Sequence, residues 1–198
     1  FCLSRGLGDV YKRQGPTCSQ LLASLGADVL RIDPPNRPEL LEQHLSTGMG
    51  KRSSSIDLTT SREDLETLFS GADVVLLGYR PGSMTRFGLD PDDLFERYPH
   101  LVIGSLSAWG ERGPWAQLPG FDSIVQAACG IAAYCNNEDC SPGTLPVQAL
   151  DHSTGYVMAA HVMESLASDN SGIIRVSLLG AARTPVSYTH LTLPTTPY

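Results

Sequence analysis

Apolar residues follow helical spacing and continuous strand-like runs in turn along most of the chain. Helical spacing, with caps and glycine stops, predicts helices over 16–26, 60–71, 91–99, 121–134 and 152–168. Short apolar runs predict strands over 27–33, 53–58, 72–79, 101–107 and 172–179. Residues 36–50 show no clear period, and 80–89 are predicted to form a loop and a short helix.

The order of these elements fixes the fold class. Strands separated by helices are typical of an α/β protein with a parallel sheet. Helices that follow each strand pack on both faces of such a sheet. The pattern therefore predicts a parallel sheet covered by helices on its two sides.

The composition of the chain argues against several classes of function. The chain has 198 residues and a net charge of −7, which argues against an extended nucleic-acid surface. No run of about 18 apolar residues occurs, so no membrane span is expected. The odd count of 5 cysteines argues against a disulfide framework and favours a reducing, cytoplasmic setting. The pair Cys135 and Cys140 lacks a second Cys/His pair at ligand spacing, so no metal site is expected.

The two ends differ from the rest of the chain. The opening "FCLSRGLGDVYKRQ" and the closing "PVSYTHLTLPTTPY" resemble translated sequencing-adapter read-through, and the chain has no initiator Met. We therefore expect non-native tails over 1–14 and 185–198. The native part, 15–184, is expected to be the N-terminal part of a longer domain.

Asp151 is the best single candidate for chemistry. It lies in "PVQALDHSTGYVM", directly before an apolar helical pattern. One interpretation is an ordinary helix N-cap. The other is a nucleophile that amide donors at the helix start hold ionised. Composition leaves both open. His152 and His161 are expected to be structural or exposed, and His161 lies too far along the helix to pair with Asp151.

Basic residues in this acidic chain are candidates for holding a phosphorylated ligand. They are Lys51, Arg52, Arg80 and Arg86, and each is also compatible with ordinary surface charge. Arg80 lies in "GYRPG", which follows a predicted buried strand. Ligands bind at such strand ends in open α/β sheets. The chain lacks a G-x-G-x-x-G after its first strand, a Walker A motif and a G-x-S-x-G elbow, which counts against dinucleotide binding, P-loop chemistry and a serine hydrolase.

Several stretches in a fixed order resemble the family III CoA-transferases, the group that includes formyl-CoA and carnitine CoA-transferases and the α-methylacyl-CoA racemases. They are "LLASLGADVLRIDPP", "GKRSSSIDL", "ADVVLLGYRPGSMTRFGL", "PHLVIGSLSAWGERGPW", "PGFDSIVQAACG" and "ALDHSTGYVMAAHVM". The family counterparts of the third and last are "ADVVVENFRPGVMERLGL" and "ADLTAGLYAAIGIL". The resemblance covers residues 15–168.

The resemblance implies a Rossmann-like large domain, an interlocked homodimer, and transfer of coenzyme A between an acyl-CoA and a carboxylic acid. Coenzyme A would be carried as a substrate, with no permanently bound cofactor. The residue that matches the family nucleophile is Asp151, which would form an acyl anhydride and then an aspartyl-CoA thioester. An isolated piece of such an enzyme is expected to be inactive.

CoA contacts are implied residue by residue. They fall on Ile56, Asp57, Leu58 and Thr59, on Gly78, Tyr79 and Arg80, and on Arg86. Two of these depart from the family pattern, because Thr59 replaces a lysine and Gly78 an asparagine. Phe121 stands where the racemases have a histidine, which favours transferase over the alternative of an acyl-CoA racemase. A CoA-binding half with degraded catalysis is the other alternative.

Overall fold

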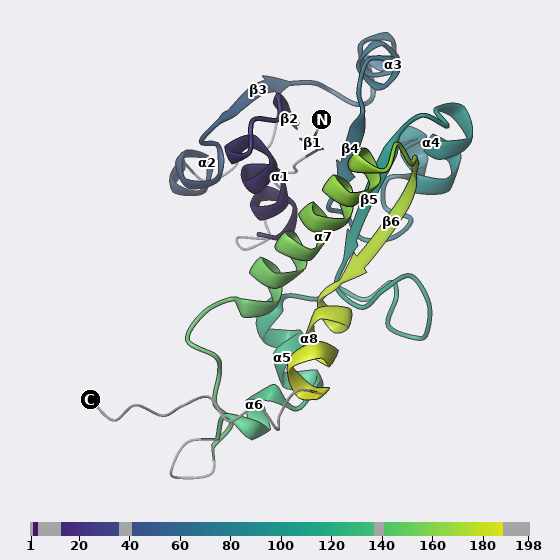
Figure 1. Cartoon of the computed structure of the whole chain (residues 1–198). Helices are drawn as coiled ribbons and strands as arrows, with labels where there is room; N and C mark the ends of the chain where they lie inside the picture. The colour runs from purple at the N-terminus through teal and green to yellow at the C-terminus, as the bar shows by residue number, and fades with distance from the viewer. Residues whose placement is uncertain (1, 4–12, 36–40, 137–140, 188–198) are drawn as a thin grey trace.

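The computed structural model describes residues 2–3, 13–35, 41–136 and 141–187 as one α/β unit (Figure 1). Its strands are β1 (Cys2–Leu3), β2 (Val29–Asp33), β3 (Lys51–Ser55), β4 (Val74–Leu77), β5 (Val102–Ser107) and β6 (Gly172–Ser177). Its α-helices are α1 (Gln14–Ser24), α2 (Leu41–Thr47), α3 (Arg62–Ser70), α4 (Pro91–Arg97), α5 (Asp122–Ala128), α6 (Ile131–Tyr134), α7 (Ala149–Ala167) and α8 (Leu178–Ser187). A 3-10 turn, η1, spans Thr85–Phe87.

The strands form a single sheet in the order β3-β2-β1-β4-β5-β6, and every described pairing is parallel. This is the strand order of the Rossmann fold, in which the direction of progression reverses between β1 and β4. The predicted parallel α/β sheet is therefore confirmed.

Alternate residues of the central strands feed two cores on opposite faces of the sheet. On β4, Val75 and Leu77 join the cluster formed with α3 and α4, whereas Leu76 joins the cluster formed with α1 and α7. Figure 1 shows α7 crossing the sheet beside α1. A strand buried on both faces needs apolar residues at successive positions, which is why these strands appear as continuous apolar runs.

Two glycines set how closely α7 approaches its neighbours. A Cβ on Gly104 of β5 would lie 2.6 Å from Leu76 Cδ2 and 2.8 Å from Met158 Sδ. A Cβ on Gly155 of α7 would lie 2.8 Å from both Gln14 O and Thr17 Cβ of α1. The first turn of α1 and the second turn of α7 therefore meet almost backbone to backbone.

The structure corrects several predicted elements. The predicted helix over 121–134 is two helices, because Gly130 adopts a left-handed φ of 82° between them. The predicted strand over 172–179 ends at Ser177, whose Oγ accepts from Gly180 N at 3.0 Å and so caps α8. Helix α2 was not predicted from the sequence. None of its residues is buried, and it therefore lacks the apolar stripe that marks a helix in a sequence.

The boundaries of the expected native domain remain predictions. The structure places Cys2–Leu3 in the sheet as β1, and α8 extends to Ser187 across the expected boundary at residue 184. Within the described residues, no helix combines the length and apolar character that a membrane crossing needs.

Candidate functional site

Three helices begin close together at the carboxyl edge of the sheet, and Asp151 lies where they meet. Its carboxylate accepts a hydrogen bond from Gln14 Nε2 of α1 at 3.1 Å. Its backbone N–H donates to Asp122 Oδ2 of α5 at 2.8 Å. Asp151 is only 2% exposed. Ligands of open α/β sheets bind at this edge, so the position suits a reactive group.

Asp151 does not cap its own helix. Helix α7 begins at Ala149, so Asp151 is in its first turn, and the N-cap residue Gln148 makes no side-chain cap hydrogen bond. The interpretation of Asp151 as an N-cap is therefore wrong. The cap comes from elsewhere in the sequence, because the Asp122 carboxylate accepts from the third amide of α7.

Asp122 is held in place by a second buried side chain. Gln126, one turn further along α5, donates from Nε2 to Asp122 Oδ1. The Oε1 atom of Gln126 accepts from the backbone N–H of Leu145 at 3.1 Å. Both Asp122 and Gln126 are buried. The polar network thus joins α5, the segment before α7 and the first turn of α7 into one rigid unit.

Burial raises the pKa of Asp151 to about 7. This value already includes the hydrogen bond from Gln14, which lowers the pKa, the negative charge of Asp122, which raises it, and the charge and backbone N–H of Arg13, which lower it. The amide of Asp151 at the start of α7 is bound to Asp122 and not to the Asp151 carboxylate. A backbone N–H at the start of α1, that of Arg13, lowers the pKa of Asp151, and the role of helix-start amides in holding this carboxylate ionised stays a prediction. Asp151 is a carboxyl group that changes its charge near neutral pH.

Two buried polar atoms on α7 lack a hydrogen-bond partner in the described part of the chain. They are Asp151 Oδ2 and Thr154 Oγ1, one helical turn apart. Native proteins satisfy most buried polar atoms, and a catalytic role is one reason for such an atom to lack a partner. Oδ2 is thus the oxygen of Asp151 that remains available for reaction.

The first predicted CoA segment follows the edge strand β3. Asp57 Oδ1 accepts from the backbone N–H of Thr59 at 2.9 Å and from its hydroxyl at 2.6 Å, which holds the pKa of Asp57 below its usual value. Ile56 and Leu58 pack partly buried against the core on the α3 side. This segment is a tight turn, with Thr59 exposed at its tip.

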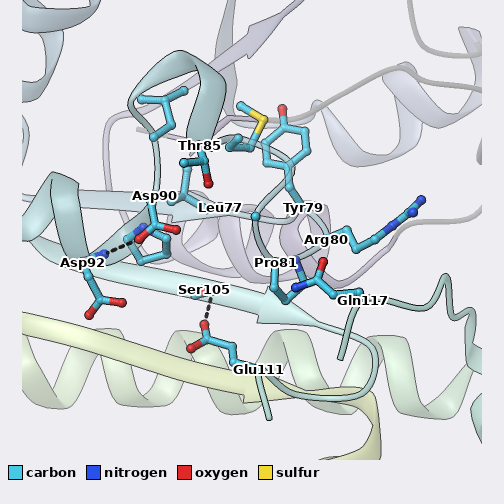
Figure 2. Close-up of a pocket in the computed structure, with 14 residues that line it drawn as sticks. Leu77, Tyr79, Arg80, Pro81, Thr85, Asp90, Asp92, Ser105, Glu111 and Gln117 are labelled. Atoms are coloured by element: carbon cyan, nitrogen blue, oxygen red, sulfur yellow. Dashed lines mark hydrogen bonds between the residues drawn. The ribbon is translucent and has the colours of Figure 1, made fainter. Parts of the chain in front are cut away.

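The second predicted CoA segment follows β4, where Gly78, Tyr79 and Arg80 begin the loop. Tyr79 and Arg80 line a cavity of about 280 Å³, whose wall also includes Ser105 and Glu111 (Figure 2). The cavity does not include Asp151 among its lining residues. The sequence-predicted nucleophile and this CoA loop therefore lie at the same sheet edge but in separate surroundings.

Arg86 and the carboxylates near the cavity complete this region. The Arg86 guanidinium lies 4.5 Å from the ring centroid of Phe87 in an exposed position on η1. Arg175 of β6 donates to Asp92 at 2.7 Å and to Glu111, and Ser105 Oγ donates to Glu111 Oε1 at 3.2 Å. Asp92 and Glu111 are thus both paired with the Arg175 cation.

The described residues contain no cluster of three or more His, Cys, Asp or Glu side chains arranged to hold a metal ion.

The remaining sequence-predicted groups are ordinary structural contacts. His152 Nδ1 lies 3.4 Å from Thr17 Oγ1, and exposed His161 pairs with Glu164 at 3.4 Å. Cys140 lies outside the described residues. Sequence reasoning missed Gln14, Asp122 and Thr154 around Asp151. Only Asp122 carried a signal, because it lies inside the family-like stretch "PGFDSIVQAACG".

Comparison with known proteins decides the family. The model of CoA-transferase family III matches residues 11–196. The chain belongs to CoA-transferase family III. The fold and the order of sequence motifs agree with this assignment, and homologues of the chain are CoA-transferases that act on CoA thioesters.

Individual relatives show how much of a family III protein the chain represents. "Probable fatty acyl-CoA transferase Rv3272" of Mycobacterium tuberculosis is 35% identical over 167 residues, which are 77% of this chain and 42% of that protein. A crystal structure of Rv3272 matches with a TM-score of 0.80 and 30% identity, covering 100% of this chain and 58% of that one. "Succinyl-CoA--D-citramalate CoA-transferase" of Chloroflexus aurantiacus is 31% identical over 69% of this chain and 38% of that protein. The chain therefore spans less than half the length of these curated relatives.

Proposed function

We propose that the full-length protein transfers coenzyme A between an acyl-CoA and a carboxylic acid, with Asp151 as the nucleophile. The observation that carries this proposal is the buried carboxylate of Asp151, whose Oδ2 is unengaged at the ligand edge of a family III fold. A carboxylate nucleophile divides an exchange between two acids into easier steps.

The steps follow from the chemistry of a carboxylate and a thioester. Asp151 Oδ2 attacks the thioester carbonyl carbon, the C–S bond breaks, and CoA thiolate leaves with its electron pair. The thiolate then attacks the Asp151 carbonyl carbon of the mixed anhydride, which releases the first acid. The acceptor carboxylate attacks the resulting aspartyl-CoA thioester, whose C–S bond breaks to release CoA thiolate and leave a second mixed anhydride. The thiolate attacks the acceptor's acyl carbon in that anhydride, and the C–O bond to Asp151 breaks, which gives the new acyl-CoA and the free Asp151 carboxylate.

The pKa of Asp151 supports this role. At about 7 it leaves the carboxyl mostly ionised under slightly alkaline conditions, while its basicity exceeds that of an ordinary carboxylate. Because Asp151 is 2% exposed, the thioester reaches Oδ2 only when neighbouring side chains move aside. Gln14, which donates to Oδ1, is one such group.

The CoA moiety is proposed to lie along the loops after β3 and β4, against Ile56, Asp57, Leu58 and Thr59 and against Gly78, Tyr79 and Arg80, with Arg86 nearby. Arg80 and Arg86 are exposed cations, so both are available to phosphate groups. The hydrogen bond between Asp57 and the backbone N–H of Thr59 fixes the geometry of this turn. The turn can therefore present its backbone groups to CoA although Thr59 replaces the lysine of the family pattern.

The full-length protein is further proposed to be a homodimer. Helix α7 exposes several large apolar side chains, and contiguous exposed apolar patches mark interaction surfaces. Its outer face exposes Tyr156, Val157 and Met163. Light scattering of the full-length protein tests this proposal, and a monomer at micromolar concentration would refute it.

Substitution of the nucleophile in the full-length enzyme tests the proposed reaction. Asp151→Ala should abolish transfer of CoA between acids, by at least about 1,000-fold, while the matched variant Asp93→Ala on exposed α4 should retain it. Hydroxylamine added during turnover should label Asp151 as a hydroxamate. Normal transfer by Asp151→Ala would refute the role, and solvent deuterium entering the α-carbon without an acceptor acid would identify a racemase instead.

A further inference from the structure

Thr154 differs from several other hydroxyl side chains in the described helices, because its hydroxyl does not donate to a preceding backbone carbonyl. Helical Ser and Thr residues commonly donate to a backbone carbonyl three or four positions earlier. In this chain Ser19, Thr67, Ser70 and Ser153 all do so, at 2.9, 2.9, 2.8 and 3.2 Å. Thr154 does not, although it is 1% exposed and its Oγ1 has no partner among the described residues.

The position of Thr154 explains what its hydroxyl can reach. Residues three apart on a helix are surface neighbours, with Cβ atoms about 5–6 Å apart. Thr154 and Asp151 have this spacing, and both lie on the buried side of α7. The second unsatisfied atom on this helix is Asp151 Oδ2. Two unsatisfied polar atoms are thus neighbours in an environment without solvent.

We propose that Thr154 is a positioning residue for Asp151, whose hydroxyl donates a hydrogen bond to Oδ2 when the carboxyl ionises. A rotation about χ1 is enough, because threonine in helices divides between two rotamers. The proton stays on the hydroxyl throughout. When Asp151 is protonated, the roles reverse, and Thr154 Oγ1 accepts from the carboxyl O–H. This inference names a residue of the site proposed above and rests on that proposed function for its catalytic meaning.

Several other groups also act on the Asp151 carboxyl. Gln14 donates to Oδ1, and Arg13 lowers the pKa of the carboxyl both through its charge and through its backbone N–H. Asp122 faces Asp151 from α5 and opposes its ionisation, and it binds the backbone amide, not the carboxylate. His152, the next residue on α7, points its Nδ1 to Thr17. Among these neighbours, Thr154 is the hydroxyl donor on α7 itself, one helical turn from Asp151 Oδ2.

A titration that needs no turnover tests the inference. The carboxyl carbon of Asp151 is followed by ¹³C NMR against pH in the parent chain and in Thr154→Val, Thr154→Ser and Ser153→Ala. A hydrogen bond to the ionised form lowers a pKa. Thr154→Val should therefore raise the midpoint for Asp151 by about one pH unit, as expected for loss of one hydrogen bond to a charged group. Thr154→Ser should restore the midpoint, and Ser153→Ala should leave it unchanged, because that hydroxyl is bound to Leu150 O.

The outcomes separate this inference from the proposed reaction. An unchanged midpoint in Thr154→Val would overturn the inference even if the full-length enzyme transfers CoA. A raised midpoint in Thr154→Val would support it even if Asp151→Ala retained transfer. If Thr154→Val does not fold, Thr154→Ala gives the same comparison. In the full-length enzyme, Thr154→Val should lower kcat about ten-fold with little change in KM and shift the pH profile toward alkaline pH, and Thr154→Ser should reverse both effects.

Discussion

Four polar side chains around the start of α7 are each less than 5% exposed. Two of them, Asp122 and Gln126, come from α5, and the other two, Asp151 and Thr154, come from α7. In the loops after β3 and β4, Thr59 and Arg80 are exposed to solvent, and so is Arg86 on η1. Both regions lie at the carboxyl edge of one sheet. The first is a fixed polar network inside the protein, whereas the second is a set of surface groups whose contacts are local. A reactive carboxyl needs the first environment to change its pKa, and a large polar ligand needs the second in order to bind and leave.

The buried network should show the largest effect, through the pH dependence of stability. The pKa of Asp151 is about 7 in the folded chain and near its usual value of 3.8 when unfolded. Between these two values the folded state binds more protons than the unfolded state. The contribution of Asp151 to the free energy of unfolding is therefore complete below about pH 4 and is lost as the pH rises through 7. Asp151→Asn should remove this slope and stabilise the chain at pH 8 by roughly 3 kcal/mol. Urea denaturation at pH 5 and pH 8 measures it, and an unaltered slope in the variant would contradict the buried-acid description.

Removing the cap of α7 should cost nearly as much. Asp122→Ala leaves the amide of Asp151 and the side chain of Gln126 without their partner, and should destabilise the chain by about 2–3 kcal/mol. Asp122→Asn keeps an acceptor oxygen but loses the charge, so it should cost less and lower the pKa of Asp151. Thermal melts compare the two variants. Equal melting temperatures for Asp122→Ala and the parent would show that α7 does not depend on this cap.

The approach of α1 to α7 gives a smaller effect. In Gly155→Ala the new Cβ would meet Gln14 O and Thr17 Cβ at 2.8 Å, so α1 must move by a fraction of an ångström. We expect a loss of about 1–2 kcal/mol. Glu164→Ala on the same helix serves as the control, with a change within about 0.5 kcal/mol, because its side chain is 75% exposed. A neutral Gly155→Ala would mean that the two helices are not held at this distance.

The exposed loops should respond in binding and not in stability. Arg80→Ala should change the free energy of unfolding by less than about 0.5 kcal/mol, because the side chain is exposed. In the full-length protein it should weaken CoA binding about ten-fold, which calorimetry measures. Arg62→Ala, on the exposed face of α3 away from the cavity, provides the control. Equal affinities of Arg80→Ala and Arg62→Ala would remove Arg80 from the proposed site.

The smallest effect is expected at the turn after β3. Thr59→Lys restores the family residue but gives up the hydroxyl bond to Asp57. We expect CoA to bind the full-length variant a few-fold more tightly, since an exposed charge contributes about 0.2–1 kcal/mol, and less tightly as salt is added. The same affinity at low and high salt would show that this turn does not meet a phosphate.

The alternation of apolar runs was enough to predict the parallel sheet, because strands buried on both faces must be apolar along their length. The ordered motifs identified the family and selected Asp151. Helix α2 and the break at Gly130 were not predictable in this way, since an exposed helix has no apolar stripe and a left-handed glycine leaves no periodic signal.

What the sequence determined by itself was the fold class, the family and the identity of one candidate nucleophile. The tertiary structure decided the environment of that nucleophile. Asp122 lies 29 positions earlier in the chain and Gln14 137 positions earlier, and only folding brings them against Asp151. Because desolvation and hydrogen bonding act through space, the cap on α7, the raised pKa of Asp151 and the unsatisfied hydroxyl of Thr154 exist only in the packed protein.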